Sequence, residues 1–200
     1  ISSIFLHKEP LNIVYIPRSF QIGGGSYGNE YLFVGPSLGP RCKSVDFPFE
    51  QLGQLPVIYI TLGTVYNNDA SFFTTCFAAL RDQPYQVVVA TGRPLEQLQL
   101  GPIPDNFIVR PYVPQLELLE HVSVFLGHGG MTTIMEVISR GVPMVVIPHA
   151  AAQVANTQRV GELELGLTLE KQEVSAKSLR DAVLQILENP GYKLRAQLMQ

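Results

Sequence analysis

The fold is decided by residues 122–140, which read VSVFLGHGGMTTIMEVISR. Residues 122–126 form a short apolar run rich in β-branched side chains, which is typical of a buried strand. Glycines occupy three of the next four positions, and apolar residues then recur at helical spacing in Met131, Ile134, Met135 and Ile138. A strand that leads through glycines directly into a helix predicts an α/β unit, with the helix amino terminus at the carboxyl end of the strand.

The same alternation continues along the chain in both directions. We predict further buried strands at residues 57–60, 86–90, 107–109, 144–147 and 167–169, with helices at 70–81, 115–120, 131–140, 151–164 and 175–188. Strands that alternate with helices indicate crossover connections, and therefore a parallel sheet with helices on both faces. The predicted fold class is α/β with a Rossmann-like sheet, which binds ligands at the carboxyl ends of its strands.

The first forty residues do not follow this alternation. They contain two strand-like runs, residues 11–16 and 31–34, with a glycine-rich turn between them and no crossover helix. Four prolines among residues 35–56 indicate a semi-rigid linker. We therefore expect residues 1–40 to be the tail of an amino-terminal domain, 41–54 a linker and 55–200 the α/β domain. A natural amino terminus and part of the carboxyl end are expected to be missing.

Gly23, Gly25 and Gly28 match the dinucleotide-binding pattern G-x-G-x-x-G, but their context does not fit. In that motif the last glycine opens a helix whose amino terminus faces the pyrophosphate. The residues that follow Gly28 are instead predicted to form a strand. We interpret the match as an ordinary turn and predict no bound cofactor.

Composition excludes several classes of protein. The 200 residues include 14 Lys and Arg against 17 Asp and Glu, a net charge of -3, which argues against binding to nucleic acid. The longest uncharged stretches, residues 51–68 and 141–158, are interrupted by Pro, Gly, Asn and Gln, so no membrane span is predicted. The two cysteines, Cys42 and Cys76, favour thiols in a reducing compartment such as the cytoplasm over a disulfide framework.

The predicted helix amino terminus after Gly130 is suited to bind a phosphate. Its first N–H groups have no partners within the helix, the helix dipole is positive there, and Gly129 and Gly130 leave the approach open. Thr132 and Thr133 place hydroxyls in the first turn, and Glu136 places a carboxylate that can accept from two adjacent hydroxyls, such as those of a ribose. A nucleoside diphosphate fits both features.

The same residues also allow plainer interpretations. Glu136 and Arg140 stand in the order that favours a surface ion pair, worth ~0.3–0.5 kcal/mol, so the residues alone support both roles of Glu136 equally. The position of His128 beside two glycines favours a functional role, whereas Tyr112 fits either stacking on a nucleobase or plain packing. His7 and His149 lack a second ligand at metal-binding spacing, and we predict no metal site.

A set of spaced residues stands in order along the second half of the chain: Tyr112-Val113-Pro114-Gln115, Leu119, His121, His128-Gly129-Gly130, Thr133, Glu136, Gly141-Val142-Pro143, Pro148 and Gln153. This set resembles the signature of nucleotide-sugar-dependent glycosyltransferases of the GT-B fold, above all the bacterial members that glycosylate macrolides and flavonoids. It covers about a fifth of the chain. Looser likeness extends from Leu11 to Tyr192.

The resemblance implies a two-domain enzyme. Its carboxyl-terminal half, represented by this chain, would bind a UDP- or TDP-sugar, and its amino-terminal half a small lipophilic acceptor. Such enzymes transfer the sugar with inversion at the anomeric carbon and need no metal. The general base is a histidine of the missing half, so the resemblance places no catalytic residue in this chain, which alone would bind but not catalyse. Its partners would be the donor, the acceptor and its own amino-terminal domain.

Residue roles also follow from the resemblance. Tyr112 stands in the place of an aromatic residue, usually Trp, that stacks on the base. The residues expected at the site are, for the nucleotide, Tyr112, Val113, Gln115 and Glu136; for the diphosphate, Gly63, Thr64, His128, Gly129, Gly130, Thr132 and Thr133; and for the sugar, Gln153 with Ala152 beside it.

One position departs from the family pattern. The family has Asp-Gln or Glu-Gln where this chain has Ala152-Gln153, and a methyl group cannot accept a hydrogen bond from the sugar. Losing one charge-assisted hydrogen bond costs ~1.5–3 kcal/mol, roughly ten- to a hundredfold in affinity. The departure fits a donor whose sugar lacks the hydroxyl that this carboxylate would bind. It also fits a substituted or impaired protein, or a rearranged contact in which Gln153 or His149 binds the sugar. It predicts altered or weakened donor use.

Two alternative functions use the same fold. A nucleotide-sugar 2-epimerase would need acid and base carboxylates at the sugar, and Ala152 argues mildly against it. A non-catalytic nucleotide-sugar-binding module needs no such groups, and Ala152 supports it.

Overall fold

The computed structural model describes residues 9–39, 45–63 and 69–200 of the chain. Its contacts divide the chain into two compact units, residues 1–40 and 41–200. All of the predicted site residues belong to the second unit.

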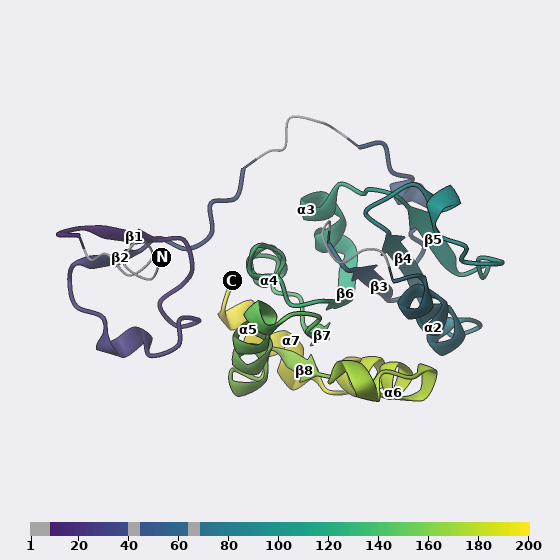
Figure 1. Ribbon diagram of the computed structural model, residues 1–200. Helices are drawn as coiled ribbons and strands as arrows, with labels where there is room; N and C mark the ends of the chain where they lie inside the picture. The colour runs from purple at the N-terminus through teal and green to yellow at the C-terminus, as the bar shows by residue number, and fades with distance from the viewer. Residues whose placement is uncertain (1–8, 40–44, 64–68) are drawn as a thin grey trace. The chain divides into compact units, whose positions relative to one another are not determined.

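The second unit is built on a parallel sheet of six strands, in the order β5-β4-β3-β6-β7-β8 (Figure 1). The strands are β3 (Val57–Thr61), β4 (Gln86–Ala90), β5 (Phe107–Arg110), β6 (Val122–Gly127), β7 (Met144–Val146) and β8 (Gly166–Thr168). Every neighbouring pair is parallel. The predicted α/β fold with a Rossmann-like sheet is confirmed.

Helices cover both faces of this sheet. They are α2 (Ala70–Leu80), α3 (Gln115–Leu118), α4 (Met131–Ile138), α5 (Ala151–Glu162), α6 (Ala176–Glu188) and α7 (Pro190–Leu198), with short 3-10 turns η2 (Phe49–Gln51), η3 (Leu95–Gln97), η4 (Leu119–His121) and η5 (Lys171–Glu173). Helices α2 and α6 pack side by side on one face, and α3, α4 and α5 lie on the other (Figure 1). Across the described ranges, none of the helices is long and apolar enough to cross a membrane.

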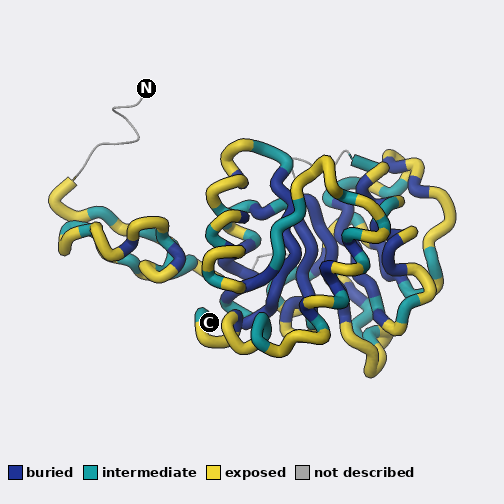
Figure 2. The backbone as a smooth tube through the Cα atoms, turned by 90° about the horizontal axis from the view of Figure 1, so that it is seen from below, coloured by how far each residue is buried: buried dark blue, intermediate teal, exposed yellow. Residues whose placement is uncertain are grey.

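The main hydrophobic core lies between the sheet and the layer of α2 and α6. Strand β3 is buried along its whole length (Figure 2). The aromatic side chains of Phe72, Phe73 and Phe77 from α2 join Leu179 and Val183 from α6 in this core. Burial of one such side chain contributes ~1.5–3 kcal/mol. The core therefore fixes the strands, and with them the loops that leave their carboxyl ends.

The predicted helices differ from the structure mainly at their ends. The helix predicted at 131–140 ends as α4 at Ile138, because the chain then turns through Gly141, whose φ is +57°. The helix predicted at 115–120 is divided into α3 and the tighter turn η4. Helix α7 begins at Pro190, which suits a first helical position because proline has no N–H to donate.

The strand order creates a topological switch between β3 and β6. Strand β3 leads to β4 on one side, whereas β6 leads to β7 on the other, so the chain leaves these two strands in opposite directions. Right-handed crossovers then place α2 and α4 on opposite faces of the sheet. Thr61 pairs with Gly127, which brings the carboxyl ends of the two strands level. Ligands of open α/β sheets bind in the crevice at such a switch.

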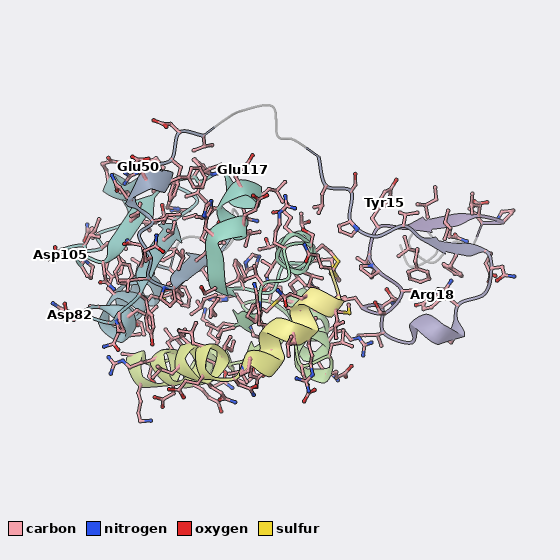
Figure 3. All side chains as sticks on the ribbon, turned by 180° about the vertical axis from the view of Figure 1, so that it is seen from behind. Tyr15, Arg18, Glu50, Asp82, Asp105 and Glu117 are labelled. Atoms are coloured by element: carbon pink, nitrogen blue, oxygen red, sulfur yellow. The ribbon has the colours of Figure 1, made fainter. Side chains whose placement is uncertain are left out.

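The first unit holds two short strands, β1 (Asn12–Val14) and β2 (Tyr31–Phe33), that pair in parallel. The guanidinium of Arg18, labelled in Figure 3, donates hydrogen bonds to the carbonyl oxygens of Gly24, Tyr27 and Tyr31. The glycine pattern between the strands forms the 3-10 turn η1 (Gly24–Ser26) and leads into β2. A strand therefore follows this pattern, as the sequence predicted, in place of the helix that a dinucleotide site requires.

Part of the predicted linker packs within the second unit. Phe47 is buried, and the ring of Phe49 lies 5.4 Å from the ring of His121. Residues 41–44 of the linker lie outside the described residues. The assignment of residues 1–40 to an amino-terminal domain stays a prediction.

Candidate functional site

The loops that follow β3 and β6 meet around the imidazole of His128. A methyl group at Gly63, after β3, would lie 2.7 Å from Cε1 of this ring, and one at Gly130 would lie 2.6 Å from Nε2. The ring therefore occupies space that only two glycines leave open. Gly63 and His128, which the resemblance assigns to opposite sides of the diphosphate, are brought together at the switch. Thr64, assigned to the same group, lies outside the described residues.

The amino terminus of α4 lies next to this ring. Gly130 is its N-cap, no side chain among the described residues caps it, and its first turn contains no acidic residue. Thr132 in this turn is exposed and Thr133 half-buried. The uncapped N–H groups and the positive end of the helix dipole can bind an anion. The geometry thus fits the predicted phosphate position.

Gly129 has a structural reason to be glycine. Its φ is +77°, a conformation that L side chains rarely adopt, and a methyl group here would lie 2.4 Å from Cγ2 of Thr157 on α5. The amide of Asn156, also on α5, donates to the carbonyl oxygen of Gly129 at 3.1 Å. Helix α5 therefore holds the loop that carries His128. Sequence reasoning missed Asn156 and Thr157, because nothing in their local pattern indicates this contact.

His128 is held in its neutral form. Burial lowers the pKa of His128, and the nearby His149 lowers it further. A neutral imidazole can donate one hydrogen bond from the ring nitrogen that carries the proton. The ring can therefore stabilise a phosphate oxygen as a hydrogen-bond donor at neutral pH.

Gln153, predicted to contact the sugar, is buried at the amino terminus of α5. Its Oε1 accepts from the N–H of His149 at 2.7 Å and from the N–H of Ala150 at 3.1 Å. The side-chain carbonyl therefore caps its own helix, which leaves the amide nitrogen as the group that can contact a ligand. Ala152 is exposed beside it.

A chain of hydrogen bonds links the middle of β3 to the start of α3 and to α4. The hydroxyl of Tyr59 donates to Oε1 of Gln115 at 2.7 Å, and Nε2 of Gln115 donates to Oε2 of Glu136. Glu136 is only 3% exposed. The Tyr59 hydroxyl binds the amide oxygen of Gln115, so the amide nitrogen faces Glu136. Each side chain therefore donates to the next, and the series ends at the carboxylate of Glu136.

The alternative role of Glu136, a surface ion pair with Arg140, is wrong. The guanidinium of Arg140 lies 3.4 Å from a carboxylate oxygen of Glu120 and donates to the carbonyl oxygen of Leu116. Glu136 is buried and contacts Gln115. Its position fits a binding role better than a solvated surface pair.

Tyr59 holds the side chain of Gln115 in place, a contact that the sequence did not reveal. Tyr59→Phe removes the donor to Gln115, and we expect it to weaken binding of UDP severalfold and to lower the free energy of unfolding by about 1 kcal/mol, the usual net value of one hydrogen bond. Calorimetric titration with UDP and urea unfolding measure the two effects. Tyr85→Phe, which removes the hydroxyl of another buried tyrosine just before β4, is the control. Equal UDP affinities in the two variants would contradict the role of Tyr59.

Tyr112 presents its ring to solvent. The residue is 54% exposed, and its hydroxyl donates to the carbonyl oxygen of Gly92 at 3.1 Å. Val113, next to it, is nearly buried. The hydroxyl anchors the ring at one end while its exposed area remains accessible to a planar ligand. Plain packing in the interior, the alternative for Tyr112, does not fit this exposure.

Metal ligands are not grouped in the described parts of the chain: no three or more His, Cys, Asp or Glu side chains come together there in an arrangement that could hold a metal ion.

Comparison with known proteins identifies the family. The model of the erythromycin biosynthesis protein CIII-like C-terminal domain matches residues 77–200. YdhE of Bacillus subtilis (strain 168), named as an uncharacterized UDP-glucosyltransferase, is 44% identical over 186 residues, which are 93% of this chain and 47% of the relative. The NDP-glycosyltransferase YjiC of the same organism is 40% identical over 192 residues, 96% of this chain and 49% of the relative.

Solved structures give the same result. The crystal structure of CalG4, the calicheamicin glycosyltransferase, matches with a TM-score of 0.86 and 32% sequence identity, over 100% of this chain and 50% of that one. The chain spans about half the length of the curated relatives it matches. The resemblance found in the sequence is confirmed: the chain belongs to the family of the erythromycin biosynthesis protein CIII-like C-terminal domain, the carboxyl-terminal half of UDP-glycosyltransferases of the GT-B fold.

Proposed function

We propose that this chain binds the nucleotide-sugar donor, a UDP- or TDP-sugar, of a glycosyltransferase. The observation that carries the proposal is the meeting of Gly63, His128 and Gly130 at the switch between β3 and β6, beside the amino terminus of α4. In this assignment the diphosphate lies against that terminus. The donors are the ring of His128, the N–H groups of residues 129–133 and the hydroxyls of Thr132 and Thr133, with Gly63 on the opposite side.

The nucleoside is assigned to the side of α3. Glu136 accepts hydrogen bonds from the ribose hydroxyls, and Gln115 orients that carboxylate. The exposed ring of Tyr112 stacks on the base, next to the backbone of Val113. The donor then extends from its base and ribose, on the side of α3, to its diphosphate at the amino terminus of α4. Its sugar lies at the amino terminus of α5, where Gln153 and Ala152 are found. This order supports the proposal because each group meets side chains of suitable chemistry.

The proposed reaction of the whole protein is an inverting displacement. An acceptor oxygen forms a bond to the anomeric carbon, and the bond from that carbon to the phosphate oxygen breaks, with its electron pair passing to the leaving nucleoside diphosphate. The charge that develops is stabilised by the amino terminus of α4 and by the N–H of neutral His128, without a metal. The base that removes the acceptor proton is proposed to lie in the amino-terminal half. This chain alone is expected to bind and not to catalyse.

The acceptor is proposed to be a small lipophilic molecule such as a macrolide or a flavonoid, which the name of the calicheamicin glycosyltransferase supports. The relatives reported above carry glycosyltransferase names, and they give the epimerase alternative no support. A non-catalytic donor-binding module remains the second candidate, favoured by the alanine at residue 152. The buried free thiol of Cys76 supports a reducing compartment such as the cytoplasm.

Titration calorimetry of the chain with UDP, UDP-glucose and NAD tests the proposed function. We expect UDP and UDP-glucose to bind and NAD to give no heat of binding, because the site is assigned to a pyrimidine nucleoside diphosphate, whereas NAD carries a purine base. Preferential binding of NAD would favour a dehydrogenase. Absence of binding by all three ligands, in protein whose circular dichroism shows a folded α/β chain, would contradict the proposal.

A further inference from the structure

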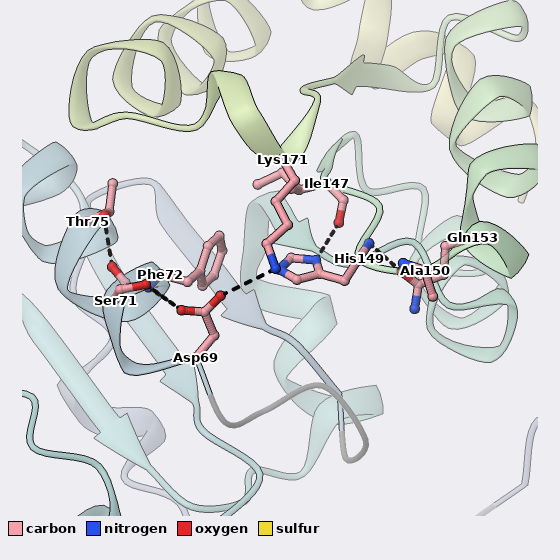
Figure 4. Close-up of polar contacts among 9 residues, drawn as sticks. All are labelled: Asp69, Ser71, Phe72, Thr75, Ile147, His149, Ala150, Gln153 and Lys171. Carbon is pink, nitrogen blue, oxygen red and sulfur yellow. Dashed lines mark hydrogen bonds and ion pairs between the residues drawn. The ribbon is translucent and has the colours of Figure 1, made fainter.

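A polar pocket of about 130 Å³ lies beside the candidate site and plays no part in the assignments above (Figure 4). Its polar lining comes from Asp69, Ser71 and Thr75 at the start of α2, from His149 after β7 and from Lys171 after β8. All these segments follow the carboxyl ends of strands, so the pocket opens on the ligand-binding edge of the sheet. Its volume is well above the ~10–15 Å³ that one water molecule needs.

The two oxygens of Asp69 have different surroundings. Oδ1 accepts from the hydroxyl of Ser71 at 2.5 Å and from the N–H of Phe72 at 3.0 Å, and thereby caps α2. Oδ2 faces Nζ of Lys171 at 3.9 Å, as Figure 4 shows. A charged N–H···O bond is ~2.7–2.9 Å long, so this pair is too far apart for a direct hydrogen bond. The gap suits a hydroxyl that donates to Oδ2 and accepts from Nζ.

Asp69 is ionised at neutral pH. Burial alone would raise the pKa of Asp69, but the hydrogen bonds from Ser71 and Phe72, together with the nearby Lys171 and His149, hold it below the usual value. A charged carboxylate is a strong acceptor for a hydroxyl group.

His149 connects this pocket to the candidate site. Its N–H donates to the side chain of Gln153, its Nδ1 lies 2.8 Å from the carbonyl oxygen of Ile147, and its ring packs edge-on against Phe72 with 5.9 Å between centres. His149 also lowers the pKa of Asp69 and of His128, which places it within electrostatic reach of both. The pocket and the diphosphate site are therefore neighbours.

The start of α5 offers a sugar few acceptors. Residues 150–152 are all alanines, and the side-chain oxygen of Gln153 already accepts two backbone hydrogen bonds. A sugar hydroxyl that approaches from the diphosphate site and needs an acceptor therefore finds a charged one across His149, at Asp69.

We propose that the pocket between Asp69 and Lys171 is a subsite for a hydroxyl-bearing part of the donor sugar, with Oδ2 of Asp69 as acceptor and Nζ of Lys171 as donor. The inference rests on the proposed function, because it requires the diphosphate to lie at α4. It assigns sugar recognition to Asp69 and Lys171 as well as to the start of α5.

The test compares two ligands that differ only by the sugar. Asp69→Asn keeps an oxygen that can cap α2 and removes the charge, and Lys171→Met changes a side chain that is 59% exposed. We expect each variant to bind UDP-glucose about tenfold or more weakly than the parent chain, as for the loss of a charge-assisted hydrogen bond, and to bind UDP with unchanged affinity. Asp181→Asn and Lys177→Met, which break an exposed ion pair on α6, are matched controls and should change neither affinity.

The outcomes separate this inference from the proposed function. If the parent chain binds UDP and UDP-glucose but Asp69→Asn and Lys171→Met bind UDP-glucose normally, the subsite is wrong and the proposed function stands. Equal losses for UDP and UDP-glucose would also overturn the subsite, because they would indicate a general change in the site. A parent chain that binds neither ligand would overturn the proposed function first. Thermal unfolding of each variant shows that the comparison is made on folded protein.

Discussion

Gly63→Ala is expected to weaken binding of UDP ten- to a hundredfold while the chain still folds. The new methyl group would lie 2.7 Å from Cε1 of His128, so the ring must move. The ring is the far end of a side chain and can rotate, which keeps the cost to folding small. Its movement removes a donor from the proposed diphosphate position, and a hydrogen bond to a charged group is worth ~1.5–3 kcal/mol.

The chain contains a matched control for this substitution. Gly101 has the same φ as Gly63, +71°, but a methyl group at Gly101 would meet nothing within 4 Å. Gly101→Ala therefore carries the same backbone strain, about 1–2 kcal/mol, without the contact with His128. We expect similar losses of unfolding free energy in both variants, measured by urea denaturation, and a loss of UDP affinity only in Gly63→Ala. Equal UDP affinities in the two variants would show that His128 does not contact the diphosphate.

The sheet could be predicted because each strand carries its own apolar run. Buried parallel strands need apolar side chains on both faces, so β3 and β6 are recognisable without knowledge of their neighbours. The closeness of Gly63 and His128 can be understood in the same way. Both come directly after these strands, and the carboxyl ends of parallel strands meet at one edge. The helix ends were predicted less well, since α4 stops at a turn set by the local backbone at Gly141.

Contacts between distant side chains could not be predicted. A tyrosine in an apolar strand gives no sign of its partner, and the bond from Tyr59 to Gln115 joins residues 56 positions apart. Gln153 was expected to face a ligand, but its carbonyl caps α5, a use that depends on the local path of residues 149–150. The pocket at Asp69 is formed by three connections that are remote in sequence. Such features depend on tertiary structure, which periodicity and spacing do not encode.

Glu136 illustrates how burial decides between two interpretations of one residue. Its spacing from Arg140 and its place one turn into the helix supported a surface pair and a ribose contact equally. Arg140 instead lies near Glu120, and Glu136 is buried against Gln115. Burying a carboxylate is costly, so a solvated pair would have no reason to adopt this position. A binding site does have a reason for this cost, because it holds the carboxylate in place for a ligand.

Glu136→Ala should therefore weaken UDP binding by about 1–3 kcal/mol, roughly five- to 150-fold. Because the carboxylate is assigned to the ribose, uridine should lose the same factor and inorganic pyrophosphate none, whereas Gly63→Ala should affect UDP and leave uridine unchanged. Competition calorimetry with the three ligands measures these losses, and Glu120→Ala, which removes the exposed partner of Arg140, is the control. A loss for UDP that uridine does not share would place Glu136 at the diphosphate. Affinities equal to those of Glu120→Ala would show that the carboxylate of Glu136 has a structural role and does not contact the ribose.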